Sequence, residues 1–480
     1  MKNKLLLIGK ILLIAISLFF SIYLVKVLKD LDVLPNKYYI LILAGLLLVN
    51  IINILTLLSK KLVLNIIGIV LSIIIIAGSC FGIKHGTKIA NFMNKAFSNN
   101  NIELSEYSVV VLKDSSYNNL NDLSGKVMGY AILDQNKNEY DAIMKLKVST
   151  ELKSYDNPYS LYEDLKDKSL DSIVVNEGFM QILEEEYEDF DDNTRIIYTF
   201  GVESKIESEV VEEVTELKPV NILISGSDSR SGKIQSKTRS DVNMIMTIDP
   251  ANHKILLTSI PRDYYVQLHG KTGLKDKLTH AGIYGINMTK TTLEDLFNIK
   301  IDYTIKVGFA SVVKIVDLVG GIDIYSDKSF RSWCGDAWAE RTNVKQGWNH
   351  FTGAQALSYA RERYAYKEGD NHRVQNQQQV LEAIIEKLAN DRSILRRYDK
   401  LLDSLSELYR TDLPSSYIKL IVKDQLENMT SWTIEKQQVS GYGSMGHCYS
   451  MPSYNLWIMI PEMSSVKNAR NNIIKITGEA

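Results

Sequence analysis

Three long apolar runs near the N-terminus constrain this chain more than any other feature. They cover residues 5–26, 39–59 and 62–83, and Lys10 is the only charge inside the first run before its end. Each is about 20 residues long, enough for a helix to cross a hydrocarbon core of roughly 30 Å. The first run is too long for a cleaved signal peptide, and two more runs follow it. We therefore predict three transmembrane helices within residues 1–93.

The lysines around these runs bear on orientation. Lys2, Lys4 and the Lys60–Lys61 pair would lie in the cytoplasm if the N-terminus is inside. The loop at 26–37 also carries lysines, which two aspartates offset only in part, so the positive-inside bias is small. This arrangement predicts a multi-pass membrane protein whose residues from about 84 onward lie on the extracellular face.

The rest of the 480-residue chain is long enough for two further domains. A net charge of −2 gives no overall field that would attract nucleic acid. Strand and helix patterns at 102–202 predict a small α/β accessory domain, which with its linker covers 94–216. From 217 to 480, strands and helices alternate, which is typical of a sheet covered by helices on both faces. The predicted fold class is therefore α/β.

Charged motifs stand at the ends of three predicted strands, which cover 220–225, 243–249 and 254–260. The motifs are GSDSR, TRSD and PRD, and they contain Asp228, Arg239, Asp241 and Arg262. Asp228 and Asp241 would be neighbours if the strands pair, and two close carboxylates repel each other unless a cation lies between them. Magnesium suits such a site, because it binds one or two carboxylates together with phosphate oxygens. Arginine binds phosphate oxygens through two donors at once.

Further cationic residues follow in the second half of the chain. Arg361 and Arg363 are two residues apart, so both can reach one pocket only where a helix gives way to extended chain. Arg373 and Gln377 lie on one face at the start of a predicted long helix, whose N-terminus favours anions. Any single arginine–carboxylate pair here is more simply a surface ion pair. The full set favours a site for a polyanion.

Other sites are excluded or left open by the residues. Residues 226–233 resemble a nucleotide-binding loop, but the glycines are spaced wrongly and Ile234 stands where Ser or Thr is needed. The histidines show no zinc-ligand spacing. Cys334 and Cys448 are either a disulfide, as two cysteines in an oxidising compartment often are, or two unrelated thiols.

In this order, the charged blocks resemble the LytR-CpsA-Psr family of cell-envelope glycopolymer transferases. The matching blocks are GSDSR, TRSD, SIPRD, KLTHAGIYG, ARER and the run from Asp370 through Arg373 to Gln377 and Gln379, and they cover roughly 217–390. Apolar spans followed by an accessory domain also resemble the capsule-associated members. Thr279 and Asn376 depart from the family pattern, which affects the expected substrate contacts and not the class.

The resemblance implies a phosphotransferase that moves a glycan polymer, such as capsule polysaccharide or teichoic acid, from a polyprenyl pyrophosphate carrier onto peptidoglycan through a phosphodiester. It implies an α-β-α layered catalytic domain with a central mixed sheet and an apolar pocket for the lipid. It also assigns catalytic roles to Arg262, Asp241 and Asp228, with Asp228 and Asp241 as ligands of Mg²⁺ (or Mn²⁺). The residues expected to bind the pyrophosphate are Arg239, Arg262, Lys277, Arg361, Arg363, Arg373 and Gln377.

Three further points remain open at this level. The helix at 311–318 and the strand at 304–309 either line the lipid channel or simply pack in the core. Phosphoryl transfer depends mainly on positioning and charge neutralisation. The general base that would accept the proton of the attacking hydroxyl is not identified, and Asp241 and Asp263 are the candidates. Two other functions use the same residues: a hydrolase of the pyrophosphate carrier, and a membrane-bound regulator that binds lipid or glycan without catalysis.

Overall fold

The chain forms two compact units. The computed structural model describes residues 2–98, 102–131, 137–144, 146, 150–155, 157–205, 213–227, 233–333, 335, 338–367, 370–390 and 408–478. The first unit comprises Met1–Phe97, Glu212–Leu217 and Pro414–Thr430. The second comprises Ser98–Val211, Lys218–Leu413 and Ser431–Ala480.

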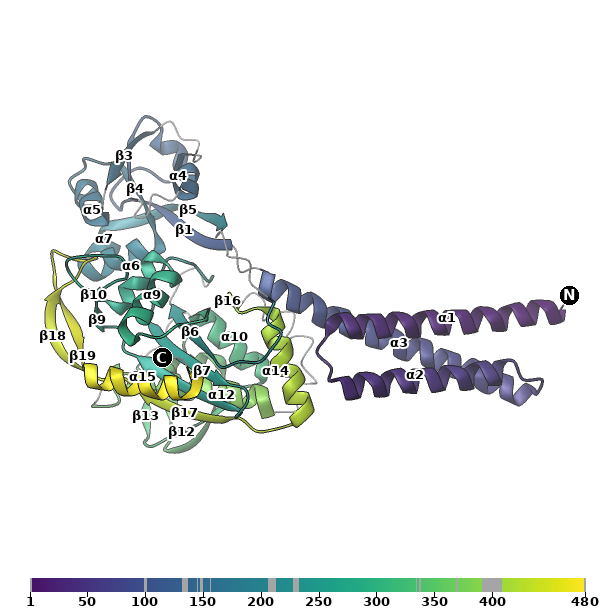
Figure 1. Cartoon of the computed structure of the whole chain (residues 1–480). Coiled ribbons are helices and arrows are strands. Elements are labelled where there is room, and N and C mark those ends of the chain that lie inside the picture. The colour runs from purple at the N-terminus through teal and green to yellow at the C-terminus, as the bar shows by residue number, and fades with distance from the viewer. Residues whose placement is uncertain are drawn as a thin grey trace. The chain divides into compact units, whose positions relative to one another are not determined.

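The first unit contains the three apolar helices, α1 (Lys2–Leu31), α2 (Asn36–Leu57) and α3 (Leu62–Ser98), drawn in purple to blue in Figure 1. By length and composition, each could cross a membrane. Most of their large apolar side chains are exposed, which favours a lipid surrounding over water. The three predicted spans are therefore confirmed as helices. The third continues to Ser98, beyond the apolar run that ends at residue 83 and beyond the predicted domain boundary at residue 93.

Polar side chains join these helices to one another. The Asn50 amide donates to Ser21 Oγ at 3.0 Å, and Ser72 Oγ donates to Asn53 Oδ1 at 3.1 Å. Such contacts between apolar helices contribute about 0.6 kcal/mol each and fix which faces meet. Helix α14 (Ser415–Asn428) belongs to the same unit, where Lys37 Nζ donates to the Glu427 carbonyl at 2.9 Å.

The accessory region of the second unit is a five-stranded mixed sheet with the strand order β3-β2-β4-β1-β5. Its strands are β1 (Ile102–Leu112), β2 (Val127–Ala131), β3 (Glu151–Tyr155), β4 (Ser172–Asn176) and β5 (Thr194–Lys205). Helices α5 (Pro158–Lys166) and α6 (Glu177–Glu186) pack on one face through Leu161, Leu165 and Phe179. Helix α4 (Lys137–Met144) packs on the other face through Ile143. The predicted small α/β domain is present.

The following region is built on a six-stranded mixed sheet with the order β16-β11-β6-β7-β8-β17. The strands are β6 (Val220–Ser227), β7 (Val242–Asp249), β8 (Lys254–Ile260), β11 (Tyr303–Gly308), β16 (Tyr409–Thr411) and β17 (Thr433–Gln438). Strand β6 pairs in parallel with β11 and antiparallel with β7, and β8 pairs in parallel with β17. The three strands predicted to carry charged motifs are thus adjacent at the centre of the sheet.

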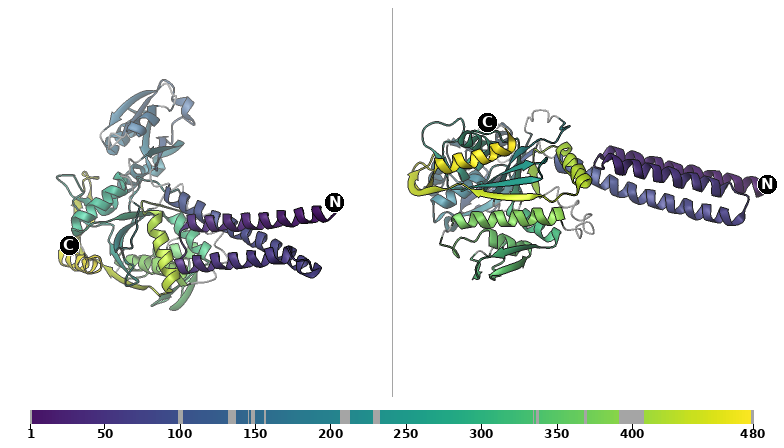
Figure 2. Two further views of the ribbon diagram at one scale, coloured as in Figure 1. Left: turned by 45° about the vertical axis from the view of Figure 1, so that its right-hand side comes forward. Right: turned by 60° about the horizontal axis from the view of Figure 1, so that its bottom comes forward.

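Alternation along these strands gives the sheet two apolar faces. Leu223, Ile245 and Leu256 pack against α9 (Ile286–Phe297) and α15 (Met463–Thr477). Ile224, Met244 and Leu257 form the other core with α12 (Asp370–Asn390). The right-hand view of Figure 2 shows α15 in yellow on one side of the sheet and α12 on the other. The α-β-α layering is therefore as predicted.

Shorter elements surround this core. Helices α10 (Phe309–Val319) and α11 (Gly353–Ala360) pack together with the β12–β15 ladder beyond α12. The remaining strands are β9 (Tyr265–Val266), β10 (Asp276–Lys277), β12 (Ile322–Ser326), β13 (Phe330–Arg331), β14 (Asn343–Val344), β15 (Gly347–Phe351), β18 (Gly441–His447) and β19 (Asn455–Pro461). The remaining short helices are η2 (Leu120–Leu123), α7 (Phe190–Asn193), α8 (Leu278–Ala281) and η3 (Gly282–Tyr284).

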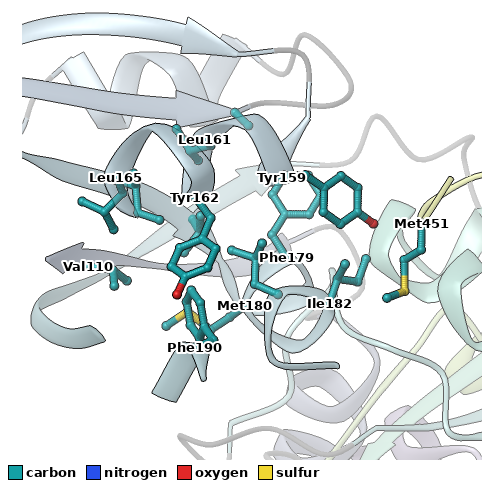
Figure 3. Close-up of a cluster of buried hydrophobic side chains, with 14 of the residues drawn as sticks. Val110, Tyr159, Leu161, Tyr162, Leu165, Phe179, Met180, Ile182, Phe190 and Met451 are labelled. Carbon is teal, nitrogen blue, oxygen red and sulfur yellow. The ribbon is translucent and has the colours of Figure 1, made fainter. Parts of the chain in front are cut away.

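The two regions of the second unit share a core. Met451, from the loop after β18, packs in the same buried cluster as Ile182 and Phe179 of the accessory helix α6. Figure 3 shows Met451 beside Ile182, with the Tyr159 hydroxyl directed toward the same loop. That hydroxyl donates to the Ser450 carbonyl. The accessory region is therefore packed onto the region built on the six-stranded sheet and is not only tethered to it.

Candidate functional site

Three strand ends meet at one edge of the central sheet. Gly226, near the end of β6, pairs with Val242 at the start of β7, and Asn243 pairs with Ile260 at the end of β8. The Asp241 amide donates to the Gly226 carbonyl at 2.8 Å. The antiparallel order thus brings the TRSD and PRD motifs together beside the end of β6, as the sequence predicts.

The TRSD segment is held by hydrogen bonds on several sides. The Ser240 amide donates to the Thr279 carbonyl at 2.9 Å, and the Thr279 amide donates to the Arg262 carbonyl at 2.8 Å. Gly282 sits so close that a Cβ there would lie 2.4 Å from the Thr238 carbonyl oxygen. A side chain at Gly282 would therefore push this segment out of position.

The accessory region also contacts this segment. Gln181 of α6 is buried, and its Oε1 accepts from the Arg239 amide at 3.1 Å. The Ser236 amide donates to the Leu104 carbonyl of β1 at 2.8 Å. The backbone that presents Arg239 and Asp241 is thus held between two regions that are far apart in sequence.

A cleft of about 270 Å³ lies at these strand ends. It gathers five of the predicted arginines around the one described acidic side chain of its lining. They come from the segment before β7, the chain just after β8, the chain just after α11, and the first turn of α12. Its lining is Arg239, Asp241, Arg262, Phe309, Trp333, Arg361, Arg363, Arg373 and Gln377. Arg361 and Arg363 reach it because α11 ends at Ala360 and the chain then leaves the helix. Arg373 and Gln377 lie near the start of α12, whose N-terminal end adds to the positive potential.

Asp241 and Arg262 form an ion pair inside this cleft. Arg262 Nη1 lies 2.7 Å from Asp241 Oδ1, and the two side chains are 24% and 12% exposed. Burial raises the pKa of the Asp241 carboxyl, but the guanidiniums of Arg262, Arg239 and Arg373 outweigh burial and lower it to about 2. Asp241 is therefore ionised at every physiological pH, and the cleft keeps an excess of positive charge.

Several predicted residues lie elsewhere or outside the described part. Asp228 is among the residues not described, so its position beside Asp241 stays a prediction. Lys277 does not line the cleft, because its Nζ is buried 3.6 Å from Asp263 Oδ1. The second Asp263 oxygen lies 3.6 Å from Arg262 Nε. Asp263 thus lies between Lys277 and Arg262, so Lys277 contacts the cleft only indirectly.

The Cys334–Cys448 disulfide, one of two alternatives that the sequence leaves open, stays a prediction, because only Cys448 is among the described residues. Cys448 is a buried free thiol whose pKa is raised to about 12, mainly by burial. Cys334 lies outside the described residues. Burial among Met451, Ile458 and the α6 side chains explains why Cys448 serves as a small apolar core residue.

Asp276, His280 and Cys448 form a buried trio of a type that could hold a metal. However, Asp276 already accepts four hydrogen bonds, two at each carboxylate oxygen. The donors are the Lys277 amide, His280 Nδ1, the Ser450 amide and Ser450 Oγ. The trio is therefore best explained as a hydrogen-bonded core that fixes the loop around Ser450.

An apolar cavity adjoins the cleft. It is about 90 Å³ and is lined mainly by aliphatic side chains from β6, β7, β11, α10 and α12. Phe309, Arg361 and Gln377 line both spaces. Val307 and Val312 belong to the strand and helix named above as possible lipid contacts, and both segments do face a cavity.

Two lining residues were not predicted from the sequence. Phe309 is the first residue of α10, directly after β11, and no charged motif marks it in the sequence. Its ring centroid lies 4.9 Å from the Arg361 guanidinium carbon. Trp333 precedes a segment with no regular pattern and reaches the cleft only through tertiary folding. The pairing of aromatic residues with the ARER arginines is the signal that a cation–π search could have used.

The model of the LytR_cpsA_psr family matches residues 190–470, which is more than half of the chain. The chain belongs to this family. One relative, the "Polyisoprenyl-teichoic acid--peptidoglycan teichoic acid transferase TagU" of Bacillus cereus, is 36% identical over 202 residues, covering 42% of this chain and 62% of that protein. The Enterococcus faecalis protein of the same name is 29% identical over 229 residues, covering 48% of this chain and 72% of that protein.

Among solved structures, Bacillus subtilis TagV is similar, with 28% identity and a TM-score of 0.47 over 55% of this chain and 100% of that chain. The match to the Bacillus TagU proteins spans less than two thirds of their length. The family match begins in the accessory region and includes every described residue of the cleft.

Proposed function

We propose that this protein is a phosphotransferase that moves a glycan polymer from a polyprenyl pyrophosphate carrier onto peptidoglycan. The observation that carries the proposal is the arginine-lined cleft joined to an apolar cavity through Phe309, Arg361 and Gln377. A pyrophosphate linked to a lipid is one of few ligands that need both surfaces side by side. The names of the relatives support a teichoic acid as the polymer, and capsule polysaccharide is the second candidate.

In this proposal the arginines bind the pyrophosphate and offset its charge. Arg239, Arg361 and Arg373 come from three different elements, so together they can surround the phosphate oxygens. Arg262 is fixed by Asp241 at 2.7 Å and would stabilise the charge that grows on the bridging oxygen. Lys277 supports this arrangement indirectly, by pairing with Asp263.

Asp241 fits a magnesium site, because it is ionised and lines the cleft. With Asp228 it would hold Mg²⁺ (or Mn²⁺), which would neutralise charge on the phosphate oxygens. A carboxyl group with a pKa of about 2 is a weak base. We therefore assign Asp241 to charge organisation and not to proton removal.

The reaction follows from this arrangement. A peptidoglycan hydroxyl attacks the phosphorus next to the glycan, and a new P–O bond forms as the bond to the bridging oxygen breaks. Polyprenyl phosphate leaves with the bonding electrons, and the hydroxyl proton goes to solvent. The aliphatic side chains beyond Phe309 would hold the first part of the lipid. The apolar helices would keep the enzyme at the carrier's membrane, with the catalytic region on the extracellular face.

A transfer assay tests this function. The full chain in detergent would be mixed with a polyprenyl pyrophosphate oligosaccharide, Mg²⁺ and peptidoglycan oligomers. We expect linked product from the native chain, and a loss of roughly 10²–10³-fold in rate for Arg262→Ala, in line with the removal of one charge-stabilising group. Arg470→Ala is the matched control, because Arg470 lies on α15 and bonds the Asn298 carbonyl outside the cleft.

Each rival function gives a different result. A hydrolase would release the glycan phosphate at the same rate with or without peptidoglycan. A regulator without catalysis would bind the lipid and turn none of it over. Equal rates for Arg262→Ala and the native chain would show that the cleft is not the reaction site.

A further inference from the structure

Trp333 and Tyr364 form an exposed aromatic pair at the cleft. Trp333 is 52% exposed and lines the cleft, and Tyr364 is 58% exposed. Their ring centroids are 4.9 Å apart with 56° between the planes. Large exposed aromatic rings are informative, because leaving them in water forgoes the stabilisation that burial would give.

A buried carboxylate holds this pair in place. Glu362 is 1% exposed, and its oxygens accept from the Trp333 amide at 2.5 Å and from the Tyr364 amide at 2.7 Å. One buried side chain thus accepts from the backbone on both sides of the ring pair. The backbones that carry the two rings are thus fixed to each other, so the rings form a pre-organised surface.

Arg363 links this surface to the phosphate-binding side. Its guanidinium carbon lies 5.8 Å from the Trp333 ring centre and 4.9 Å from the Tyr364 ring centre. Arg363 Nη2 also donates to the Tyr364 hydroxyl at 2.8 Å. A ligand on the rings therefore has a cation directly beside it.

The positions of the cleft and the apolar cavity indicate how a lipid-linked substrate would be oriented. Phe309, Arg361 and Gln377 line both the cleft and the apolar cavity, whereas Trp333 and Arg363 line only the cleft. In a lipid–pyrophosphate–sugar molecule, the lipid would occupy the shared side. The group on the other side of the pyrophosphate would then meet Trp333.

We infer that Trp333, with Tyr364, is the binding surface for the first sugar ring of the lipid-linked glycan. This inference rests on the proposed function. A pyranose presents C–H bonds from one face, and these complement the negative face of an indole ring. Its hydroxyl groups stay hydrated or reach Arg363. The same contact would let the enzyme distinguish a loaded carrier from an empty one.

The test compares two ligands on the full chain in detergent: polyprenyl pyrophosphate alone, and the same lipid carrying a disaccharide. We expect the native chain to bind the sugar-bearing lipid more tightly. Trp333→Ala should weaken that binding roughly tenfold and leave binding of the sugar-free lipid unchanged, while Trp333→Phe should keep most of the difference. Trp348→Ala is the matched control, because Trp348 is 74% exposed and does not line the cleft.

Other results would overturn the inference. If Trp333→Ala weakened the binding of both lipids equally, Trp333 would only maintain the shape of the cleft. An increase only in the KM for peptidoglycan would place the acceptor on the rings instead. If Trp333→Ala changed the binding of neither lipid, Trp333 would not be part of the binding site. If the native chain bound neither lipid, the proposed function itself would fail, which is a distinct outcome.

Discussion

Arg262 and Asp241 are the two side chains whose pairing sets the charge of the cleft. Asp241→Asn removes the carboxylate and leaves Arg262 in a cleft with four other guanidiniums. We expect transfer to fall by roughly 10²–10³-fold, with a smaller affinity for Mg²⁺. Transfer rates measured across a magnesium titration check this result. If the variant kept the native rate at every magnesium concentration, Asp241 would have no role in the chemistry.

At the scale of residues, the arginines of the cleft could be predicted from the sequence, whereas Trp333 and the place of Lys277 could not. Arg239, Arg361, Arg363 and Arg373 were predictable because each follows a strand or helix boundary in a motif. Trp333 was not predictable, because its place depends on the bonds that Glu362 makes after folding. Lys277 was assigned to the pyrophosphate from the resemblance alone, and its pairing with Asp263 could not be read from spacing.

At the scale of elements, the accessory helix α6 supports the segment that presents Arg239. Gln181→Leu would remove the side-chain acceptor of the partly buried Arg239 amide, which costs about 1–3 kcal/mol. We expect a fall of roughly tenfold in kcat as the segment shifts, and rescue by Gln181→Glu, which keeps an acceptor. Steady-state transfer kinetics check this prediction.

The control for this experiment is Gln346→Leu, since Gln346 is an exposed glutamine outside the cleft. Unchanged kinetics in Gln181→Leu would show that the accessory region does not position the site. A loss that Gln181→Glu fails to restore would point to general damage to the packing.

The same helix gives the protein a pH dependence. Burial raises the pKa of Glu186 from 4.5 to about 7, although its hydrogen bond with Tyr159 lowers it. Because the folded pKa is the higher one, protons stabilise the fold, and this stability is lost as pH rises from about 4.5 through 7. We expect Glu186→Gln to flatten that decline, which is on the order of 3 kcal/mol for this change in pKa at about 1.4 kcal/mol per pKa unit. Denaturant unfolding between pH 5 and 8 measures it, and equal slopes would contradict it.

Strand positions were predictable because β6, β7 and β8 are bounded by charge and turn residues. The end of the third apolar helix was not, since hydropathy marks the apolar span to 83 and the helix continues to Ser98. The sequence also could not show that helix α14 belongs to the first unit, together with the three apolar helices. Its pattern is amphipathic, and tertiary bonds, such as those of Lys423 with Asp32 and of the Glu427 carbonyl with Lys37, reveal its partners.

At the scale of the whole molecule, orientation across the membrane is testable. Lys60→Cys and Gln346→Cys would each be made in a chain whose native cysteines are replaced, because both positions are exposed. A maleimide that cannot cross membranes should label Gln346→Cys in intact cells and label Lys60→Cys only after lysis. The reverse pattern would place the catalytic region in the cytoplasm.

The central claim is that the cleft joins a lipid-borne glycan phosphate to peptidoglycan, and the identity of the product tests it most directly. Mass spectrometry of the products made by the full chain should show one phosphate between the glycan and a peptidoglycan sugar. Polyprenyl phosphate should appear in equal amount. Free glycan phosphate as the sole product in the presence of peptidoglycan would contradict the account.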